Sequence, residues 1–344
     1  MKQYLIPEGG KFYKANMHMH TTISDGKLTP EETKRIFLDK GYSIVAYTDH
    51  EALVPHNDLT DENFLAITSY EVNTMDRWPA PFPYSSCYHL NLYAKDPNAT
   101  ESSIFSLKYF WGEIKQGKEF VSEACKAIDY TRHYSVEGIN DMIRKANEDG
   151  FLVCYNHPVW SNQHYPDYAG LKGLWAVEVY NGGCNRGGYL ENTQAFNDLL
   201  FKNEPVFPIA ADDAHGAAGC GHGWIQIKAE KLEYKTVMDA LERGDFYSST
   251  GPEIHDLYIE DGIVHLSCSD ATDIYLRSER RFCRAKHTTE DAPLTAVTFD
   301  INSYIEESKK TSVVHCDPWF RIEVYDRRGK QACTRAFFLK DLDL

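Results

Sequence analysis

The sequence predicts an α/β protein with a largely parallel sheet or barrel, followed by a small antiparallel β domain. Runs rich in β-branched and aromatic residues alternate with helical segments through about residue 250, and shorter alternating runs follow. The candidate strands of the first part are SIVAYTDH, FLAITSYEV, YHLNLYA, FLVCYNHP, AVEVYNGG, VFPIAADDAH and GWIQIKA.

Helix signals lie between these strands. Thr29-Pro30-Glu31-Glu32 combines an N-cap residue, a first-turn proline and a capping-box glutamate, and the helix that it starts should end near Gly41. Glycines that would end further helices stand at Gly150 and Gly244. This punctuation is typical of strands joined by helices rather than of a strand-only protein.

Two domains are expected, an α/β sheet or barrel over residues 1–250 and a small β domain over residues 251–344. A polar and aromatic stretch from about 97 to 135 interrupts the alternation, and we interpret it as an insertion that covers one end of the barrel. After Gly251-Pro252 the runs DLYIEDGIVHLSCS, TDIYLRS and FRIEVYD have the period of antiparallel strands.

Composition excludes several classes of protein. The chain has 344 residues and a formal charge of -15, which argues against a nucleic-acid polymer as partner because phosphate backbones are bound mainly by Lys and Arg. The sequence has no apolar run of membrane-spanning length and no signal peptide at its start, so a cytoplasmic location is expected. The nine cysteines include no C-x-x-C pair and are expected to be reduced.

Two pairs of ligand-type residues have the period of a strand. His18 and His20 stand at i and i+2, where their imidazoles would share one face, and Asp213 and His215 repeat that spacing after the apolar run VFPIA. One such pair is weak evidence, but two are much less expected by chance. Together they predict a metal site.

Most of the further candidate ligands stand at the carboxyl ends of other predicted strands, where the active sites of α/β proteins gather, although His89 begins a strand and Asp25 stands in a turn. They are Asp25, His50, Glu71, His89 and His157. A cluster of His, Asp and Glu without Cys suits Mn, Fe or Zn. Asp25 could instead be an ordinary turn residue. Asp49 could orient other groups of the site rather than bind a metal ion. Asp212 should face away from Asp213, because neighbouring residues in a strand point to opposite faces.

At these residues the sequence resembles the PHP (polymerase and histidinol phosphatase) superfamily. The motifs NMHMH, YTDH, SYEV, YHLNL, NHPVW and ADDAHG stand in that family's order, and the match covers roughly residues 12 to 250. The tail, with GDFYSSTGPEI and FRIEVYDRRGKQA, resembles the β-sandwich extension of the CehA/McbA-like branch.

The resemblance implies a distorted (β/α)7 barrel followed by a small antiparallel β-sandwich, with three ion sites. One site would use His18, His20, Glu71 and Asp213. A second would share Glu71 and add His89 and His157, and a third would take Asp25, His50 and His215.

We therefore expect a phosphoesterase that hydrolyses a small-molecule phosphate ester by attack of a metal-bridging hydroxide. Glu71 is the predicted bridging carboxylate, and His222 is the candidate acid for the leaving group. Arg186 is the candidate clamp for a phosphate oxygen, with Arg132 as its rival, although a solvated surface position is the simpler interpretation of both arginines.

Two alternatives stay open. The same ions could hydrolyse a carbamate or carboxylic ester, which gains support if both arginines point away from the metals. A metal-stabilised binding module without turnover is the other alternative, and the oligomeric state is left open. The default interpretation of the remaining histidines is structural; these are His56, His133, His164, His255, His265, His287 and His315.

Overall fold

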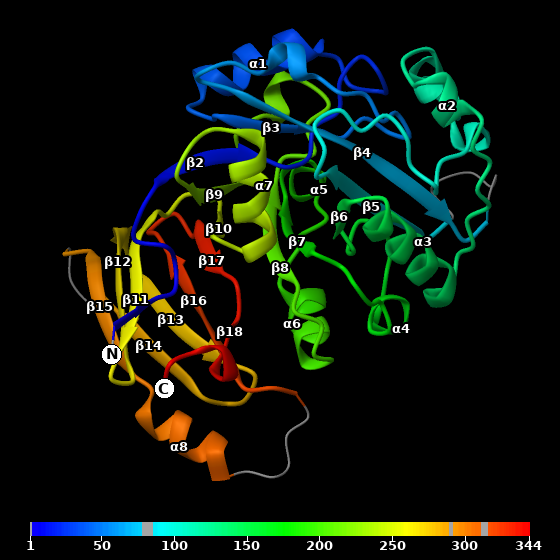
Figure 1. Ribbon diagram of the computed structural model, residues 1–344. Coiled ribbons are helices and arrows are strands. Elements are labelled where there is room, and N and C mark those ends of the chain that lie inside the picture. The colour runs from blue at the N-terminus through cyan, green and yellow to red at the C-terminus, as the bar shows by residue number, and fades with distance from the viewer. Residues whose placement is uncertain (1, 78–84, 289–291, 311–315) are drawn as a thin grey trace.

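Seven strands form a barrel in the computed structural model, which describes residues 2–77, 85–288, 292–310 and 316–344 (Figure 1). The ring closes beyond β2 and β8, where Met19 pairs in parallel with Ala214. There the His20 N–H donates to Ala214 O at 3.1 Å, and the Asp213 N–H donates to His18 O at 2.9 Å. The strands are β2 (Lys11–Asn16), β3 (Ile44–Tyr47), β4 (Leu65–Met75), β5 (Cys87–Ala94), β6 (Phe151–Tyr155), β7 (Ala176–Asn181) and β8 (Phe207–Ala211).

The barrel is mixed rather than uniformly parallel. β2, β3 and β4 run parallel to one another, as do β6, β7 and β8, whereas β5 is antiparallel to both of its neighbours. Each of the seven predicted strand runs contains a strand, six of them in the barrel and the seventh, GWIQIKA, beside it, and the α/β barrel with a β-sandwich that was predicted is confirmed. The distortion comes from β5, which reverses direction within the ring.

Helices cover the outside of the barrel and begin and end where the sequence signals stand. In α1 (Pro30–Asp39) the Glu32 N–H donates to the Thr29 side chain at 3.2 Å, and the Thr29 N–H donates to Glu32 Oε2 at 3.0 Å, which confirms the capping box. The other barrel helices are α3 (Val136–Glu148), α4 (Tyr165–Tyr168), α5 (Gly182–Arg186), α6 (Gln194–Phe201) and α7 (Tyr234–Arg243).

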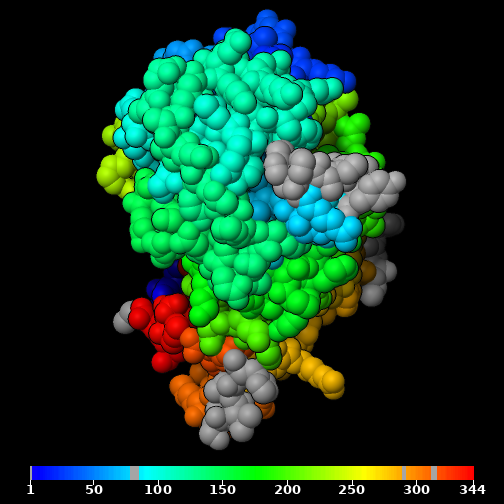
Figure 2. Space-filling model, turned by 90° about the vertical axis from the view of Figure 1, so that its right-hand side faces the viewer, coloured from blue at the N-terminus to red at the C-terminus, as the bar shows by residue number. Residues whose placement is uncertain are grey.

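The segment 97–135 lies over the loop that follows β2. It contains short 3₁₀ helices and α2 (Glu123–Lys126), and its Phe105 and Phe110 pack with Ile23 of that loop. Gln116 Nε2 donates to Ser24 O at 2.7 Å. In Figure 2 the cyan and green surface of this segment and α3 covers much of the face in view.

The C-terminal region is a β-sandwich whose two sheets enclose a core that includes Ile259, Leu266, Ile274 and Ile322. One sheet contains β1 (Lys2–Tyr4), β11 (Ile254–Glu260), β12 (Ile263–Ala271) and β15 (Leu294–Asp300). The other contains β13 (Asp273–Ser278), β14 (Cys283–His287), β16 (Trp319–Tyr325), β17 (Gln331–Thr334) and β18 (Phe337–Phe338). α8 (Asn302–Lys310) packs its Tyr304 and Ile305 into the same core.

The barrel and the sandwich are joined by hydrogen-bonded strands. β9 (Trp224–Ala229) pairs with β2, β10 (Phe246–Ser249) pairs with β9, and β17 of the sandwich pairs with β10. The N-terminal strand β1 belongs to the sandwich, so both chain ends lie there (Figure 1). The division into two domains at residue 250 stays a prediction.

None of the helices in the described ranges combines the length and the apolar composition that a bilayer crossing requires. The described cysteines form no disulfide, and all of them except Cys283 are buried.

Candidate metal centre

The nine predicted metal ligands lie together at the end of the barrel where the parallel strands finish. Their ligand atoms fall into four overlapping groups, within each of which all atoms lie within 4.8 Å of one another. The groups are His20, Asp25, His50 and His215; His18, Glu71 and His157; His18, His20 and Asp213; and His50, Glu71 and His89. Shared members make these groups one continuous cluster.

Glu71, near the middle of β4, is the central carboxylate. Its two oxygens face different imidazoles, so the side chain can bridge ions on either side of it. Oε2 lies 3.1 Å from His50 Nδ1, 3.3 Å from His20 Nε2 and 3.4 Å from His18 Nε2, whereas Oε1 lies 3.0 Å from His89 Nδ1 and 3.3 Å from His157 Nε2.

Two further carboxylates extend the cluster toward solvent. Asp213 Oδ1 lies 3.1 Å from His20 Nε2, and Asp25 Oδ1 lies 3.5 Å from His215 Nε2. The His215 side chain is 40% exposed and Asp25 is 21% exposed, whereas His18 and His20 are fully buried. The centre therefore opens at the side of His215 and Asp25.

The cluster contains buried polar atoms that the chain itself does not satisfy. Within the described residues, His20 Nδ1, Glu71 Oε2, His89 Nε2 and Asp213 Oδ1 are buried without a hydrogen-bond partner. An unsatisfied buried polar atom costs about 1–3 kcal/mol, so four in one place need a ligand. Nitrogen and carboxylate oxygen are the donors that divalent Mn, Fe and Zn accept, and the residues fit such ions.

The pKa values show how strongly these groups interact. Burial opposes charge on all of them, yet the carboxylates of Asp213 and Glu71 raise the pKa of His20 to about 10. In the same way, His18 and His20 hold the pKa of Asp213 well below its usual range despite its burial. Burial lowers the pKa of His50 to about 3. The neighbouring imidazoles therefore favour the anionic form of Asp25, Glu71 and Asp213, which is the form that binds cations.

Two of the predicted ligands occupy backbone conformations that side chains rarely adopt. His157 has φ 26° and Asp213 has φ 49°, both in the region that favours glycine. Non-glycine residues with such φ values cost of order 1–3 kcal/mol and concentrate at functional sites. In addition, a Cβ at Gly26 would lie 2.1 Å from His20 O, so only glycine lets the loop bearing Asp25 approach the His20 backbone.

A buried glutamate that the sequence did not point to holds two of the predicted ligands. Glu178 Oε1 lies 2.7 Å from His18 Nδ1, and Glu178 Oε2 accepts the His157 N–H at 3.0 Å. Asn181 donates to Glu178 Oε2 at 2.9 Å and to Asp213 Oδ2 at 3.1 Å. A carboxylate in the middle of the apolar run AVEVYN was the available signal, because a buried charge needs a partner.

Asp49 and Asp212 orient loops. Asp49 accepts hydrogen bonds from the Thr21 and Ser24 backbone N–H groups at 2.7 and 3.2 Å. Asp212 accepts the N–H groups of Gly221, His222 and Gly223 at 2.7, 2.7 and 2.9 Å. Neither residue belongs to the candidate ligand groups.

Arg132 lies behind the centre, not in its mouth. Its guanidinium forms a buried, bidentate pair with Glu51 at 2.6 and 2.7 Å, and Nη1 also donates to Asn73 O at 2.8 Å. The Glu51 N–H donates to Glu71 O at 2.7 Å. Arg132 therefore supports the backbone of Glu71, and its donors are not directed to a substrate.

Arg186 and His222 lie together at the exposed edge of the centre. Arg186 Nη1 is 3.2 Å from His222 Nε2 and also contacts Ala218 O. A hollow of about 430 Å³ is lined by Arg186 and Lys27 together with the ligands Asp213 and His215. Lys27, which the sequence analysis did not single out, is thus a further cation at this edge.

Two tryptophans complete the cavity over the metal ligands. It has a volume of about 190 Å³ and is lined by Trp111 of the segment 97–135 and by Trp160. The Trp160 ring meets the rings of His157 and His89 edge-on, with centroids 4.9 and 5.5 Å apart. No periodic pattern in the sequence predicted that Trp111 and Trp160 would line this cavity.

The other described histidines stand apart from these groups. His56 is buried against the ring of Tyr47, His265 stacks on Tyr258, and His287 Nδ1 lies 2.7 Å from Asp273. His315 lies outside the described residues.

Neither a protein-family model nor a curated protein sequence matches the chain. Several solved structures are similar to it. One is a two-domain protein containing a predicted PHP-like metal-dependent phosphoesterase from Bacteroides vulgatus, at 16% identity over 97% of this chain and 98% of that chain, with a TM-score of 0.44.

Others are an amidohydrolase from Chromobacterium violaceum and a lesion-specific endonuclease from Pyrococcus furiosus. The amidohydrolase is 15% identical over 59% of this chain and 87% of its own, with a TM-score of 0.36. The endonuclease is 12% identical over 67% of this chain and 56% of its own, with a TM-score of 0.41.

Proposed function

We propose that this chain is a metal-dependent hydrolase of the PHP superfamily and that it hydrolyses a phosphate ester of a small molecule. The convergence of five imidazoles on the two oxygens of Glu71 supports this proposal most directly. Four unsatisfied buried atoms in the same place support it further, because they are free to coordinate. The proposal includes two or three divalent ions per chain.

The residues would have different roles at such a metal centre. Glu71 would bridge ions, and the groups built on Asp213 and on Asp25 would hold them on either side. Divalent ions held there act as Lewis acids toward a phosphoryl oxygen and lower the pKa of a water molecule, which is what phosphate ester hydrolysis requires. Glu178 fixes the His18 imidazole so that its Nε2 faces Glu71 and Asp213.

The positively charged side chains at the open edge of the metal centre favour a phosphorylated substrate. Lys27 and Arg186 line a hollow that shares Asp213 and His215 with the centre. A guanidinium can donate two parallel hydrogen bonds to a phosphate, so we assign Arg186 to a non-bridging oxygen. Arg132 is excluded from that role by its buried pair with Glu51.

His222 is our candidate for the acid that protonates the leaving group. Its backbone N–H is held by Asp212, and its Nε2 lies 3.0 Å from Ala218 O and 3.2 Å from Arg186 Nη1. This places the imidazole at the same edge as the phosphate clamp. A proton on Nε2 donates to Ala218 O in this geometry, and a leaving alkoxide would have to replace that carbonyl as its acceptor.

A second candidate is hydrolysis of a carbamate or carboxylic ester. The 190 Å³ cavity directly over the ligands is walled by Trp111 and Trp160, and no Lys or Arg stands among its described lining residues. An uncharged acyl group fits these aromatic walls better than a charged phosphate group does. A binding module without turnover is the third candidate, and only an activity measurement separates it from the first two.

The test is a substrate panel run with added Mn, Fe or Zn. The panel contains phosphomonoesters, cyclic and open phosphodiesters, carbamates and carboxylic esters, and the enzyme is wild type, Asp213→Asn or Asp239→Asn. Asn tolerates the left-handed backbone of Asp213, so the variant should fold, and Asp239 on the surface of α7 is the matched control.

We expect metal-dependent phosphoester hydrolysis by wild type and Asp239→Asn, and at least 100-fold less by Asp213→Asn. Hydrolysis of carbamates or esters alone would replace the first candidate by the second. Hydrolysis of no panel member by the metal-loaded protein would favour the binding module.

A further inference from the structure

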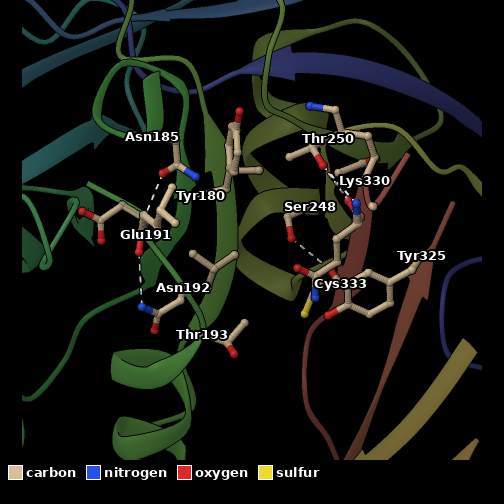
Figure 3. Close-up of a pocket in the computed structure, with 16 residues that line it drawn as sticks. Tyr180, Asn185, Glu191, Asn192, Thr193, Ser248, Thr250, Tyr325, Lys330 and Cys333 are labelled. Atoms are coloured by element: carbon tan, nitrogen blue, oxygen red, sulfur yellow. Dashed lines mark hydrogen bonds between the residues drawn. The ribbon is translucent and has the colours of Figure 1, made fainter. Parts of the chain in front are cut away.

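A second cavity, larger than the one over the metal ligands, lies outside the barrel. It is a cleft of about 410 Å³ between β7 with its following loop and the strands that continue into the sandwich (Figure 3). One wall is formed by residues 179–180, 185 and 190–193, and the other by β10, β16 and β17. Its size falls within the range of about 300–1,000 Å³ that small-molecule sites occupy.

The cleft is lined mainly by uncharged polar side chains. Among its described lining residues Lys330 is the one cation and Glu191 the one carboxylate. Glu191 points away from the cleft (Figure 3), and its oxygens accept the backbone N–H groups of Val159 and Trp160 at 3.0 and 2.8 Å. What remains for a ligand is therefore a set of hydroxyl and amide groups and one amine.

Several of these groups have unused hydrogen-bonding capacity. With the described residues, the hydroxyls of Tyr180 and Thr193 and the side-chain amide of Gln331 form no hydrogen bond, nor does Lys330 Nζ form an ion pair. Thr193 precedes α6 but does not cap it. Hydroxyl and amide groups both donate and accept, so they match ligand hydroxyls, which do the same.

Two tyrosine rings also line the cleft. Tyr180 comes from the barrel wall and Tyr325 from the sandwich wall (Figure 3). An aromatic ring beside polar groups suits a ligand that has C–H faces and hydroxyl edges. A multiply charged ligand does not fit, because one amine cannot neutralise it.

We infer that this cleft binds a sugar-sized polyhydroxylated ligand that has at most one anionic group, with Lys330 as the partner of that group. The barrel separates this site from the metal centre. Glu178 faces His18 inside the barrel, whereas the next residue of β7, Val179, lines the cleft on the outside. The inference therefore does not depend on the proposed hydrolysis.

Calorimetric titration of the full metal-free chain tests it, with glucose, galactose, ribose and glucuronate as probes. None of these is a phosphate ester, so hydrolysis does not interfere. We expect saturable binding of at least one probe. The double variant Tyr180→Phe/Thr193→Val, which removes two hydroxyls and keeps both shapes, should weaken it tenfold or more.

The role of the Lys330 charge is tested separately. Lys330→Met should weaken glucuronate at least fivefold and leave a neutral sugar unchanged, whereas Lys286→Met, on the exposed face of β14, should change neither. Circular dichroism of each variant establishes that it is folded. Saturable binding of no probe, or a double variant that binds as tightly as wild type, would overturn the inference.

Discussion

Glu178 Oε1 lies 2.7 Å from His18 Nδ1, and neither side chain is exposed. This contact places the proton of His18 on Nδ1 and leaves Nε2 free to face Glu71 and Asp213. The other Glu178 oxygen holds the backbone of His157, which has a positive φ. One residue outside the ligand groups thus orients two members of them.

Glu178→Gln should weaken metal binding by about 10- to 100-fold, which is the usual effect of losing a carboxylate that orients a ligating histidine. The side chain keeps its size, so the fold should survive. Competition against a metal-sensitive dye measures the affinity. Glu62→Gln, at an exposed position, is the control and should bind metal as wild type does. Equal affinity in all three proteins would show that Glu178 does not orient His18.

Arg132→Ala should lower the free energy of unfolding by about 3–5 kcal/mol, because it leaves the buried Glu51 carboxylate without its partner. Urea denaturation measures the loss. Arg144→Ala, on the surface of α3, removes an exposed pair and should cost about 1 kcal/mol or less. If the two variants lose the same stability, the Arg132–Glu51 pair is not a structural support.

Arg186→Ala should reduce kcat/KM for a phosphoester substrate by about 10- to 100-fold, the worth of a hydrogen bond to a charged group. Arg186→Lys keeps the positive charge but cannot donate two parallel hydrogen bonds. Its kcat/KM should therefore lie between those of wild type and Arg186→Ala. Arg35→Ala on exposed α1 provides the comparison. Unchanged kcat/KM in Arg186→Ala would remove this residue from the substrate site and strengthen the ester candidate.

Glu191 should make stability depend on pH. Burial raises the pKa of Glu191 from 4.5 to about 7, although the backbone N–H groups that it accepts act in the opposite direction. A raised folded-state pKa contributes stability that is complete below pH 4.5 and is lost as the pH rises through about 7.

Relative to Glu191→Gln, the wild-type free energy of unfolding should therefore fall by roughly 3 kcal/mol between those two values. Denaturation of both proteins across this pH range measures it, and the titrations of the metal ligands cancel in the difference. Parallel profiles would contradict the raised pKa.

The sequence predicted the barrel strands and the ligand cluster because both depend on local patterns. Apolar runs specify buried strands, and ligand-type residues directly after parallel strands meet at one edge of the barrel. Glu71 and His89 differ, because they lie within β4 and β5. The pairs at His18 and Asp213 have strand spacing, and the backbone hydrogen bonds that close the barrel lie between them.

Other features depend on contacts between distant residues, which local patterns do not show. Arg132 was a candidate substrate clamp because its partner Glu51 lies 81 residues away in the chain. The pairing of β1 with β11 in the sandwich likewise joins the start of the chain to residues 258–260. Trp111 reaches the metal cavity from an irregular segment that has no periodic signal.

The number of ions bound per chain tests the central claim most directly. Native mass spectrometry of the protein reconstituted with Mn should find about two to three ions on wild type, the number that we propose for the centre. Because Glu71 belongs to two of those groups, Glu71→Gln should lose more than one ion. A wild-type chain that binds no ion, or a Glu71→Gln chain that binds as many as wild type, would contradict a metal centre built around Glu71.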